Sequence, residues 1–306
     1  MDALPVVSAA VLQEITKLEA DILTRLNEPS ATAPKFPADL AERRLQLLAA
    51  HLGYQPQTPV PVLHVLGDSH TAFFSGVEGL KFYSGRGIFT GFFRRRFISA
   101  YTELLPVFRV FHTGASTAWS ADVYGFASRT REKIEALLRK DIPVRGSVLL
   151  VYGEIDCRWH IPRSVLAGKT IAAAVGETVT RFLPLPVRLA RAGYDVTVWQ
   201  PPGVTVAEPT PPEANHPLPT SGPQQLRLDI TRAYCEQLAA ACARENIRCT
   251  GIVGKYHGWN ETAPLDCFLD QCHLSQRMMP LTLRTLVEAG ALPLKPPTGA
   301  SSPLAG

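Results

Sequence analysis

The sequence predicts an α/β fold, a three-layer α/β/α sandwich in which helices cover both faces of a five-stranded parallel sheet. Two observations lead to this class. Short apolar runs alternate along the chain with longer stretches whose apolar residues recur at a spacing of about 3.6. The 306 residues, 46% of them hydrophobic, are enough to bury one large core, so a single domain with additions at its ends accounts for the whole length.

The first part of the chain, residues 1–58, is expected to form a helical extension ahead of the main domain. Within it, residues 9–28 and 37–52 carry apolar side chains at helical spacing. The main domain then spans residues 59–292. The remaining tail, 293–306, is rich in Pro, Ser, Ala and Gly and is expected to be disordered.

The elements of the main domain follow in chain order. Apolar runs predict strands at 62–66, 107–111, 147–152, 195–199 and 247–252. Helical spacing predicts helices over 119–139, 164–192, 223–245 and 275–289. The Pro-rich segment 201–223 follows the fourth strand, and it is either a loop that frames a ligand or a solvated connector.

Two short motifs, one near each end of the main domain, carry the chemistry. Gly67-Asp68-Ser69-His70 follows the first apolar run directly, and Asp270-Gln271-Cys272-His273 lies just before the last predicted helix. A serine hydroxyl is a poor nucleophile near neutral pH and needs a base, which in turn needs a group that orients it. His273 is the candidate base, and Asp270 is the candidate orienting carboxylate. The alternative is structural: Ser69 caps a turn, and His273 packs beside a helix start.

These motifs resemble the SGNH (GDSL-like) hydrolase superfamily rather than the α/β-hydrolases, whose Gly-x-Ser-x-Gly elbow is absent. Gly67-Asp68-Ser69-His70 resembles the first of four family blocks, with His in place of the usual Leu. The second block, whose glycine N–H joins that of the serine in an oxyanion hole, is matched at Gly114, and the fourth by Asp270 and His273. The resemblance implies a flavodoxin-like fold and a Ser-His-Asp triad that requires neither a metal nor an organic cofactor.

The third block departs from the family. The family motif is Gly-x-Asn-Asp after a buried strand, whereas this chain has Gly153-Glu154-Ile155-Asp156. Ile155 replaces the Asn whose side chain helps to bind the oxyanion, and losing one such donor costs roughly a hundredfold in rate. Arg158 is a candidate replacement donor, or a holder of an anionic group of the substrate. In the family the last Asp of this block often bonds the backbone of the first block, which is the role implied for Asp156.

Charged residues around the serine are candidates for shaping the site or binding substrate. Asp68 and His70 flank the serine, and Glu154 and Asp156 precede Arg158 at the expected carboxyl end of a strand. Ligands of open α/β sheets bind in the crevice outside those strand ends. The alternative for the second group is a structural cluster of ion pairs that shapes the loop.

Composition limits the partners. The net charge of +4 is too small to indicate nucleic-acid binding, and no basic-aromatic pattern of an RNA- or DNA-binding module occurs. No apolar run approaches the roughly 20 residues of a membrane helix. Because the N-terminus also lacks a secretory pattern, a cytoplasmic protein without a membrane span is expected. The six cysteines lack zinc-site spacing and are expected to be reduced thiols, with no metal bound.

The sequence therefore predicts a serine ester hydrolase or O-acyltransferase acting on a short acyl or acetyl ester of a small molecule or carbohydrate. Trp119 and Trp159, each close to one of the blocks, are candidates for stacking on sugar rings, although packing is the commoner role of a Trp. A second class stays open: a catalytically impaired SGNH-fold protein that binds a ligand or assists glycan assembly, which Ile155 favours. The oligomeric state is left open.

Overall fold

The computed structural model describes residues 62–76, 99–100, 107–207, 209 and 219–293, together with scattered helical positions between residues 10 and 47. The extension expected over residues 1–58 and the tail expected over 293–306 lie outside the described residues, apart from those positions and residue 293. Within the described part of the chain, no helix combines the length and the apolar character needed to cross a bilayer.

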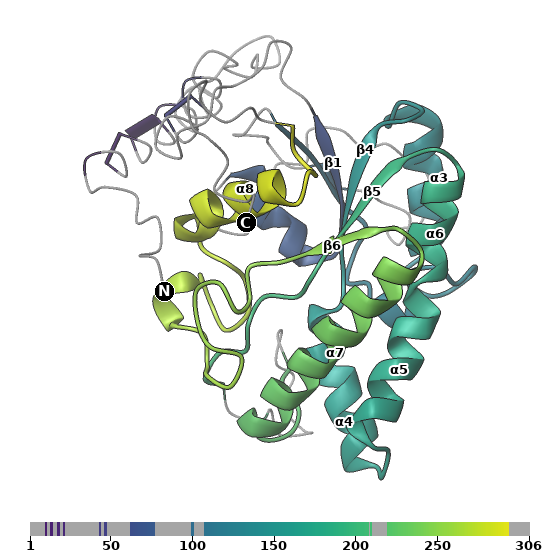
Figure 1. The fold of residues 1–306 in the computed structure, drawn as a ribbon, viewed down its shortest axis with the longest axis vertical. Coiled ribbons are helices and arrows are strands. Elements are labelled where there is room, and N and C mark those ends of the chain that lie inside the picture. Colours follow the sequence, from purple (N-terminus) through teal and green to yellow (C-terminus); the bar gives the residue numbers. More distant parts are fainter. Residues whose placement is uncertain are drawn as a thin grey trace, which may run out of the picture.

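A single six-stranded sheet forms the centre of the molecule, in the order β2-β3-β1-β4-β5-β6 (Figure 1). Its strands are β1 (Leu63–Gly67), β2 (Ser99–Ala100), β3 (Phe108–His112), β4 (Ser147–Val151), β5 (Asp195–Trp199) and β6 (Arg248–Thr250). Five strands pair in parallel, and the two-residue β2 pairs antiparallel with β3. The parallel strands, numbered by chain order, run 2-1-3-4-5, which is the flavodoxin-like order. The predicted fold class is confirmed.

Helices cover both faces of this sheet. They are α3 (Thr130–Lys140), α4 (Ile161–Leu166), α5 (Ile171–Phe182), α6 (Pro184–Arg191), α7 (Gln224–Arg244) and α8 (Met279–Glu288). Figure 1 shows α3 to α7 on one side of the strands and α8 on the other. Short helical turns complete the loops: η1 (Ser69–Ser75), η3 (Ala118–Ser120), the π-helical η4 (Asp156–His160), η5 (Leu265–Cys267) and η6 (Gln276–Met278).

Two of the predicted helices differ most from those in the structure. The helix expected over 164–192 is divided into α4, α5 and α6, because Gly168 ends α4 with a φ of +105° and Pro184 starts α6 as a residue without an N–H to donate. The helix expected from residue 119 begins at Thr130, after the short turn η3. The edge strand β2 was not predicted, because two residues carry no periodicity.

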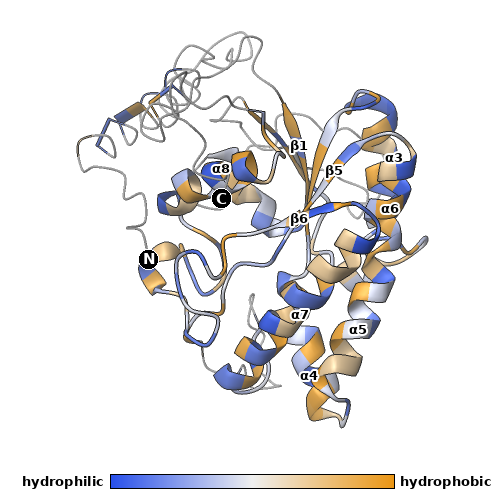
Figure 2. Ribbon diagram, viewed as in Figure 1, coloured by the Kyte–Doolittle hydropathy of each residue, from blue (hydrophilic) through white to orange (hydrophobic). Residues whose placement is uncertain are grey.

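The buried residues of the strands divide between two hydrophobic clusters, one on each face of the sheet. In β4, Leu149 and Val151 join the cluster that contains α8, whereas Val148 and Leu150 join the cluster that contains α3, α5, α6 and α7. The central strand β1 is hydrophobic along most of its length, and the edge strand β6 is hydrophilic (Figure 2). Burial on both faces is what makes the central strands continuous apolar runs in the sequence.

The register of the central strands brings the sequence motifs to one edge of the sheet. Gly67 of β1 is paired with His112 of β3 and with Val151 of β4, so the three loops that follow start at the same level. Only a glycine fits at position 67, because a Cβ there would lie 2.0 Å from the carbonyl oxygen of Val151. The serine motif therefore leaves the sheet between the other two blocks.

Candidate active site

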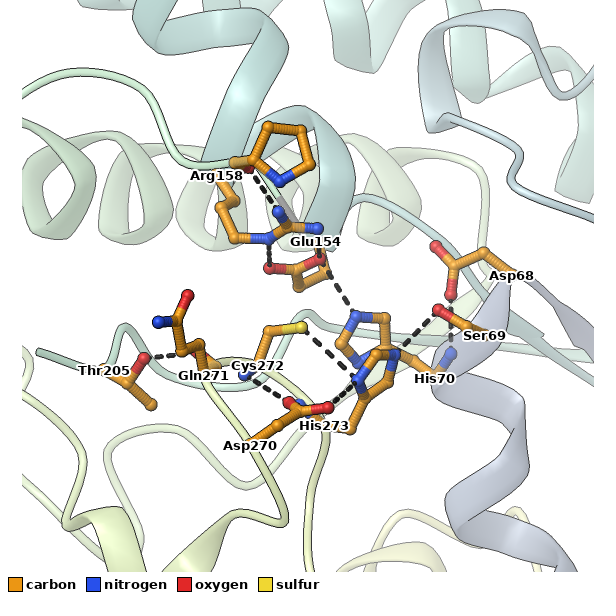
Figure 3. A network of polar contacts seen from close by, with 11 residues as sticks. Asp68, Ser69, His70, Glu154, Arg158, Thr205, Asp270, Gln271, Cys272 and His273 are labelled. Atoms are coloured by element: carbon orange, nitrogen blue, oxygen red, sulfur yellow. Dashed lines mark hydrogen bonds and ion pairs between the residues drawn. The ribbon is translucent and has the colours of Figure 1, made fainter. Parts of the chain in front are cut away.

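Ser69, His273 and Asp270 form one continuous hydrogen-bonded chain (Figure 3). Ser69 is the first residue of η1, directly beyond β1, and its Oγ lies 2.8 Å from Nε2 of His273. On the other side of the ring, Nδ1 of His273 lies 2.8 Å from Oδ2 of Asp270. The His273 residue is 3% exposed, whereas Ser69 is partly accessible. The two ends of the domain thus meet at a serine that solvent can reach.

The turn from Asp270 to His273 is built to hold the imidazole. Oδ1 of Asp270 accepts hydrogen bonds from the backbone N–H groups of Cys272 and His273, each at 2.8 Å. The N–H of Leu269 donates to the carbonyl oxygen of His273, which closes the turn. Burial alone would raise the pKa of Asp270, but the hydrogen bonds from His273 and Cys272 outweigh it and hold that pKa well below its ordinary value. Asp270 is therefore ionised at neutral pH.

A second histidine stacks on the first. The rings of His70 and His273 lie with their centroids 4.6 Å apart and their planes at 25°. His70 Nε2 in turn lies 2.9 Å from Oε2 of Glu154, the residue after Gly153 in the third block. Burial lowers the pKa of His70, although the charge of Glu154 opposes this effect. The sequence marked His70 only as a flanking residue, because nothing local to it reveals a partner 84 residues away.

Glu154 is shared between His70 and Arg158. Arg158 Nε donates to Oε1 of Glu154 at 2.6 Å, Nη2 donates to Oε2 at 3.2 Å, and Nη1 donates to the carbonyl oxygen of Pro219. Burial would raise the pKa of Glu154, but Arg158 and His70 lower it to about 2. The guanidinium is therefore bound to Glu154 and to the segment after β5. These bonds use three of the five guanidinium N–H groups, and the role of Arg158 as a third oxyanion donor stays a prediction.

The two aspartates of the first and third blocks have structural partners. Asp68 is fully buried, and its Oδ1 accepts from the N–H of His70 at 2.9 Å. Burial raises the pKa of Asp68 well above its ordinary value, with only partial offset from that hydrogen bond. Asp156 accepts from the N–H groups of Ala118 at 2.6 Å and Trp119 at 3.4 Å, and burial raises its pKa to about 7. These bonds hold η3, the turn that follows the second block, whereas the resemblance implied a bond to the first block.

Two backbone N–H groups, one of the serine itself and one of the loop after β3, are available to bind an oxyanion. The N–H groups of Ser69 and Gly114 donate to no other group in the described part of the chain. Gly114 has a φ of +105°, and the loop before it is fixed by the hydroxyl of Thr113, which donates to the Gly67 carbonyl oxygen at 2.9 Å, and by Lys133 Nζ, which donates to the Thr113 carbonyl oxygen at 2.5 Å. Ile155, half-buried at the start of η4, supplies no side-chain donor.

The ends of the Pro-rich segment after β5 contact this site. The Thr205 hydroxyl donates to the carbonyl oxygen of Gln271, and the Pro219 carbonyl oxygen accepts from Arg158. One end of the segment thus contacts the histidine turn and the other contacts Arg158. These contacts favour a loop that frames the site over a solvated connector. Of the intervening residues, 208 and 210–218 lie outside the described part.

Cys272 adds a sulfur to the cluster. Its Sγ lies 3.4 Å from Nδ1 of His273. One ligand atom each from His70, Cys272 and His273 lie within 4.8 Å of one another, and two imidazoles with a thiol are residue types that can bind a metal ion. Both histidines, however, already bond carboxylates, His70 to Glu154 and His273 to Asp270. Burial raises the pKa of the Cys272 thiol, and all six cysteines are free.

No family model and no curated protein matches the chain. Among solved structures, it is similar to phospholipase A1 from Streptomyces albidoflavus NA297, with a TM-score of 0.39 and 13% identity over 75% of this chain and 99% of that one. It is also similar to an extracellular lipase from Streptomyces rimosus, with a TM-score of 0.35 and 11% identity over 75% of this chain and 100% of that one. The class of the protein, a flavodoxin-like α/β domain, rests on its own strand order.

Proposed function

We propose that the chain is a serine ester hydrolase of the SGNH type, or an O-acyltransferase that uses the same acyl-enzyme, acting on a short acyl ester of a carbohydrate. The observation that carries this proposal is the chain of two 2.8 Å contacts from Ser69 through His273 to Asp270. It is supported by the order of the four sequence blocks and by two backbone donors beside the serine.

In the proposed mechanism, Ser69 Oγ attacks the acyl carbonyl carbon while Nε2 of His273 takes the hydroxyl proton. Asp270 stabilises the imidazolium that forms and keeps Nδ1 of His273 protonated toward itself. The N–H groups of Ser69 and Gly114 receive the oxyanion. His273 then protonates the leaving alcohol. Water or a sugar hydroxyl, deprotonated by the same nitrogen, attacks the acyl-enzyme, the bond from the acyl carbon to Ser69 Oγ breaks, and His273 returns the proton to Oγ. No step requires a metal or an organic cofactor.

His70 is proposed as a positioning residue. Its ring covers one face of His273, and Glu154 and Arg158 fix it in place through buried contacts of 2.9 and 2.6 Å. A base held between an orienting carboxylate and a stacked ring has little freedom to turn away from the serine. Correct placement of catalytic groups within about 1 Å is worth roughly a hundredfold in rate.

The rival function is a catalytically impaired ligand-binding protein, and Ile155 is the observation that favours it. Without the Asn side chain, the oxyanion is received by backbone donors alone, at a cost of about 2.7 to 4 kcal/mol in the barrier. A serine already bonded to its base at 2.8 Å favours the enzyme, because a binding protein has no need of that arrangement.

Turnover of p-nitrophenyl acetate and of O-acetylated methyl glucoside tests the proposal. We expect both esters to be hydrolysed, and Ser69→Ala to reduce turnover to the background rate. Ser75→Ala, on the same helical turn with its hydroxyl bonded to the Ala72 carbonyl oxygen, is the matched control and is expected to retain activity. Methyl glucoside added as an acceptor, with p-nitrophenyl acetate as the donor, separates transferase from hydrolase. Only a transferase passes the acetyl group to the sugar. Turnover that survives Ser69→Ala contradicts the proposal.

A further inference from the structure

A cavity of about 450 Å³ lies beside the proposed oxyanion hole, between the loop after β3, the turn η4 and the helices α4 and α5. Its size falls within the range of small-molecule sites. Its lining includes Ala115, Trp119, Phe126, Asp156, Ser164 and Thr178. None of these side chains takes part in the Ser69–His273–Asp270 chain.

The cavity shares its walls with the catalytic loops. Ala115 directly follows Gly114, and Asp156 ends the block that begins at Gly153. Asp156 also ties the two walls together, because its carboxylate accepts the backbone N–H groups of Ala118 and Trp119. A ligand seated here would therefore contact the same two segments that flank the acyl carbon.

The hydroxyl groups of the lining are disposed to accept hydrogen bonds. The Ser164 hydroxyl donates to the carbonyl oxygen of His160 at 3.2 Å, and the Thr178 hydroxyl donates to that of Ala174 at 3.1 Å. Each oxygen keeps acceptor capacity after giving its proton. These acceptors suit a ligand rich in hydroxyl donors, whereas an acyl chain would bury them without partners at a cost in free energy.

The aromatic and charged residues point to a neutral ligand. Trp119 and Phe126, in edge contact with centroids 6.2 Å apart, offer apolar ring surface next to the hydroxyls. The charged pair at the cavity, Lys169 and Glu177, is self-neutralised at 2.5 Å, and Arg181 lies 3.6 Å over the Trp119 ring. The Arg181 Nε–H donates to the Trp119 carbonyl oxygen, and the described residues of the lining itself include no Lys or Arg other than the paired Lys169. Aromatic surface combined with hydroxyl acceptors is the chemistry that recognises a sugar ring rather than a phosphate or carboxylate.

We propose that this cavity binds the saccharide portion of the ester, so that the alcohol is recognised here and the acyl group is cleaved at Ser69. The inference rests on the proposed function and adds the place where the carbohydrate binds. It assigns a binding role to Trp119, one of the two Trp residues that the sequence marks for stacking on sugars.

Filling the cavity tests this proposal. Ser164→Phe places a ring in the cavity from α4, and Leu166→Phe, on the same helix at a 61% exposed position outside the lining, is the matched control. We expect Ser164→Phe to lower kcat/KM for O-acetylated methyl glucoside by about tenfold relative to kcat/KM for p-nitrophenyl acetate, a loss typical of one or two binding contacts. Leu166→Phe is expected to leave this ratio unchanged. An unchanged ratio for Ser164→Phe overturns the proposal.

A binding measurement keeps the test independent of turnover. Calorimetric titration of Ser69→Ala with O-acetylated methyl glucoside is expected to show binding, weakened about tenfold when Ser164→Phe is added. No binding to Ser69→Ala, while the wild-type chain hydrolyses p-nitrophenyl acetate, overturns the cavity assignment and leaves the serine hydrolase standing. Binding that depends on Ser164 in a chain that hydrolyses no ester supports the cavity and contradicts the proposed enzyme.

Discussion

At the scale of single residues, His273 is the most constrained group of the site. Four side chains surround its ring: Ser69 at Nε2, Asp270 and Cys272 at Nδ1, and His70 on one face. All four side chains belong to the two motifs at the ends of the domain. Because Glu154 of the third block holds His70 in place, the position of His273 depends on three separate loops.

Replacing His70 tests its positioning role. We expect His70→Ala to lower kcat by roughly tenfold to a hundredfold with little change in KM, because it frees the base rather than removing a substrate contact. His70→Phe keeps the stacked ring without the bond to Glu154 and is expected to restore part of kcat. Steady-state kinetics on p-nitrophenyl acetate across pH, alongside urea unfolding, separate a misplaced base from a damaged fold. Equal losses in both variants, tracking stability alone, contradict the role.

Glu154 gives a residue-scale prediction for stability against pH. Its folded pKa of about 2 is below its ordinary value of 4.5, so its contribution is present above pH 4.5 and is lost as the pH falls through 2. We expect Glu154→Gln to cost about 3 to 5 kcal/mol at pH 7, because Arg158 and His70 lose a buried partner.

Urea unfolding at a series of pH values checks this prediction. The difference in unfolding free energy between the wild type and Glu154→Gln should hold between pH 7 and pH 5 and shrink below pH 4.5. Glu132→Gln, which removes the more exposed pair with Arg129, is the control and should cost at most about 1 kcal/mol. A difference in unfolding free energy that grows on acidification would contradict the predicted loss of the Glu154 contribution at low pH.

At the scale of elements, the close packing of β1 against β4 sets the position of the serine. Gly67→Ala would put a Cβ 2.0 Å from the Val151 carbonyl oxygen, so the two strands must separate. We expect a loss of more than about 4 kcal/mol in unfolding free energy, at the severe end for point mutations. Gly193→Ala, with a φ of +90° but open space around it, should cost only about 1 to 2 kcal/mol. Similar losses of unfolding free energy for Gly67→Ala and Gly193→Ala in urea titrations would contradict the role assigned to close strand packing.

The elements themselves were predictable to different degrees. Central strands such as β1 and β4 are buried on both faces, so their apolar runs stand out in the sequence. The helix predicted over 164–192 was wrong in its continuity, because Gly168 and Pro184 interrupt a pattern whose apolar spacing continues past them. The two-residue β2 exists through its pairing with β3, and such a pairing leaves no local signal.

At the scale of the whole molecule, the sheet brings together residues that no local pattern connects. Ser69 and His273 are 204 positions apart, and their meeting was predictable from the motif resemblance alone. The bonds of Arg158 to Glu154 and Pro219 were not, since they depend on how the segment after β5 folds back over the strand ends. The cavity beside Gly114 was equally hidden, because its walls come from three separate segments.

The location of a covalent serine adduct shows directly whether Ser69 is the nucleophile. The wild-type chain, treated with a fluorophosphonate probe and mapped by peptide mass spectrometry, is predicted to carry one adduct, on Ser69. Ser69→Ala is predicted to carry none, with its circular dichroism spectrum and urea unfolding unchanged in form. A folded wild-type chain that is not labelled, or an adduct of equal yield in Ser69→Ala, would contradict the assignment of Ser69 as the nucleophile.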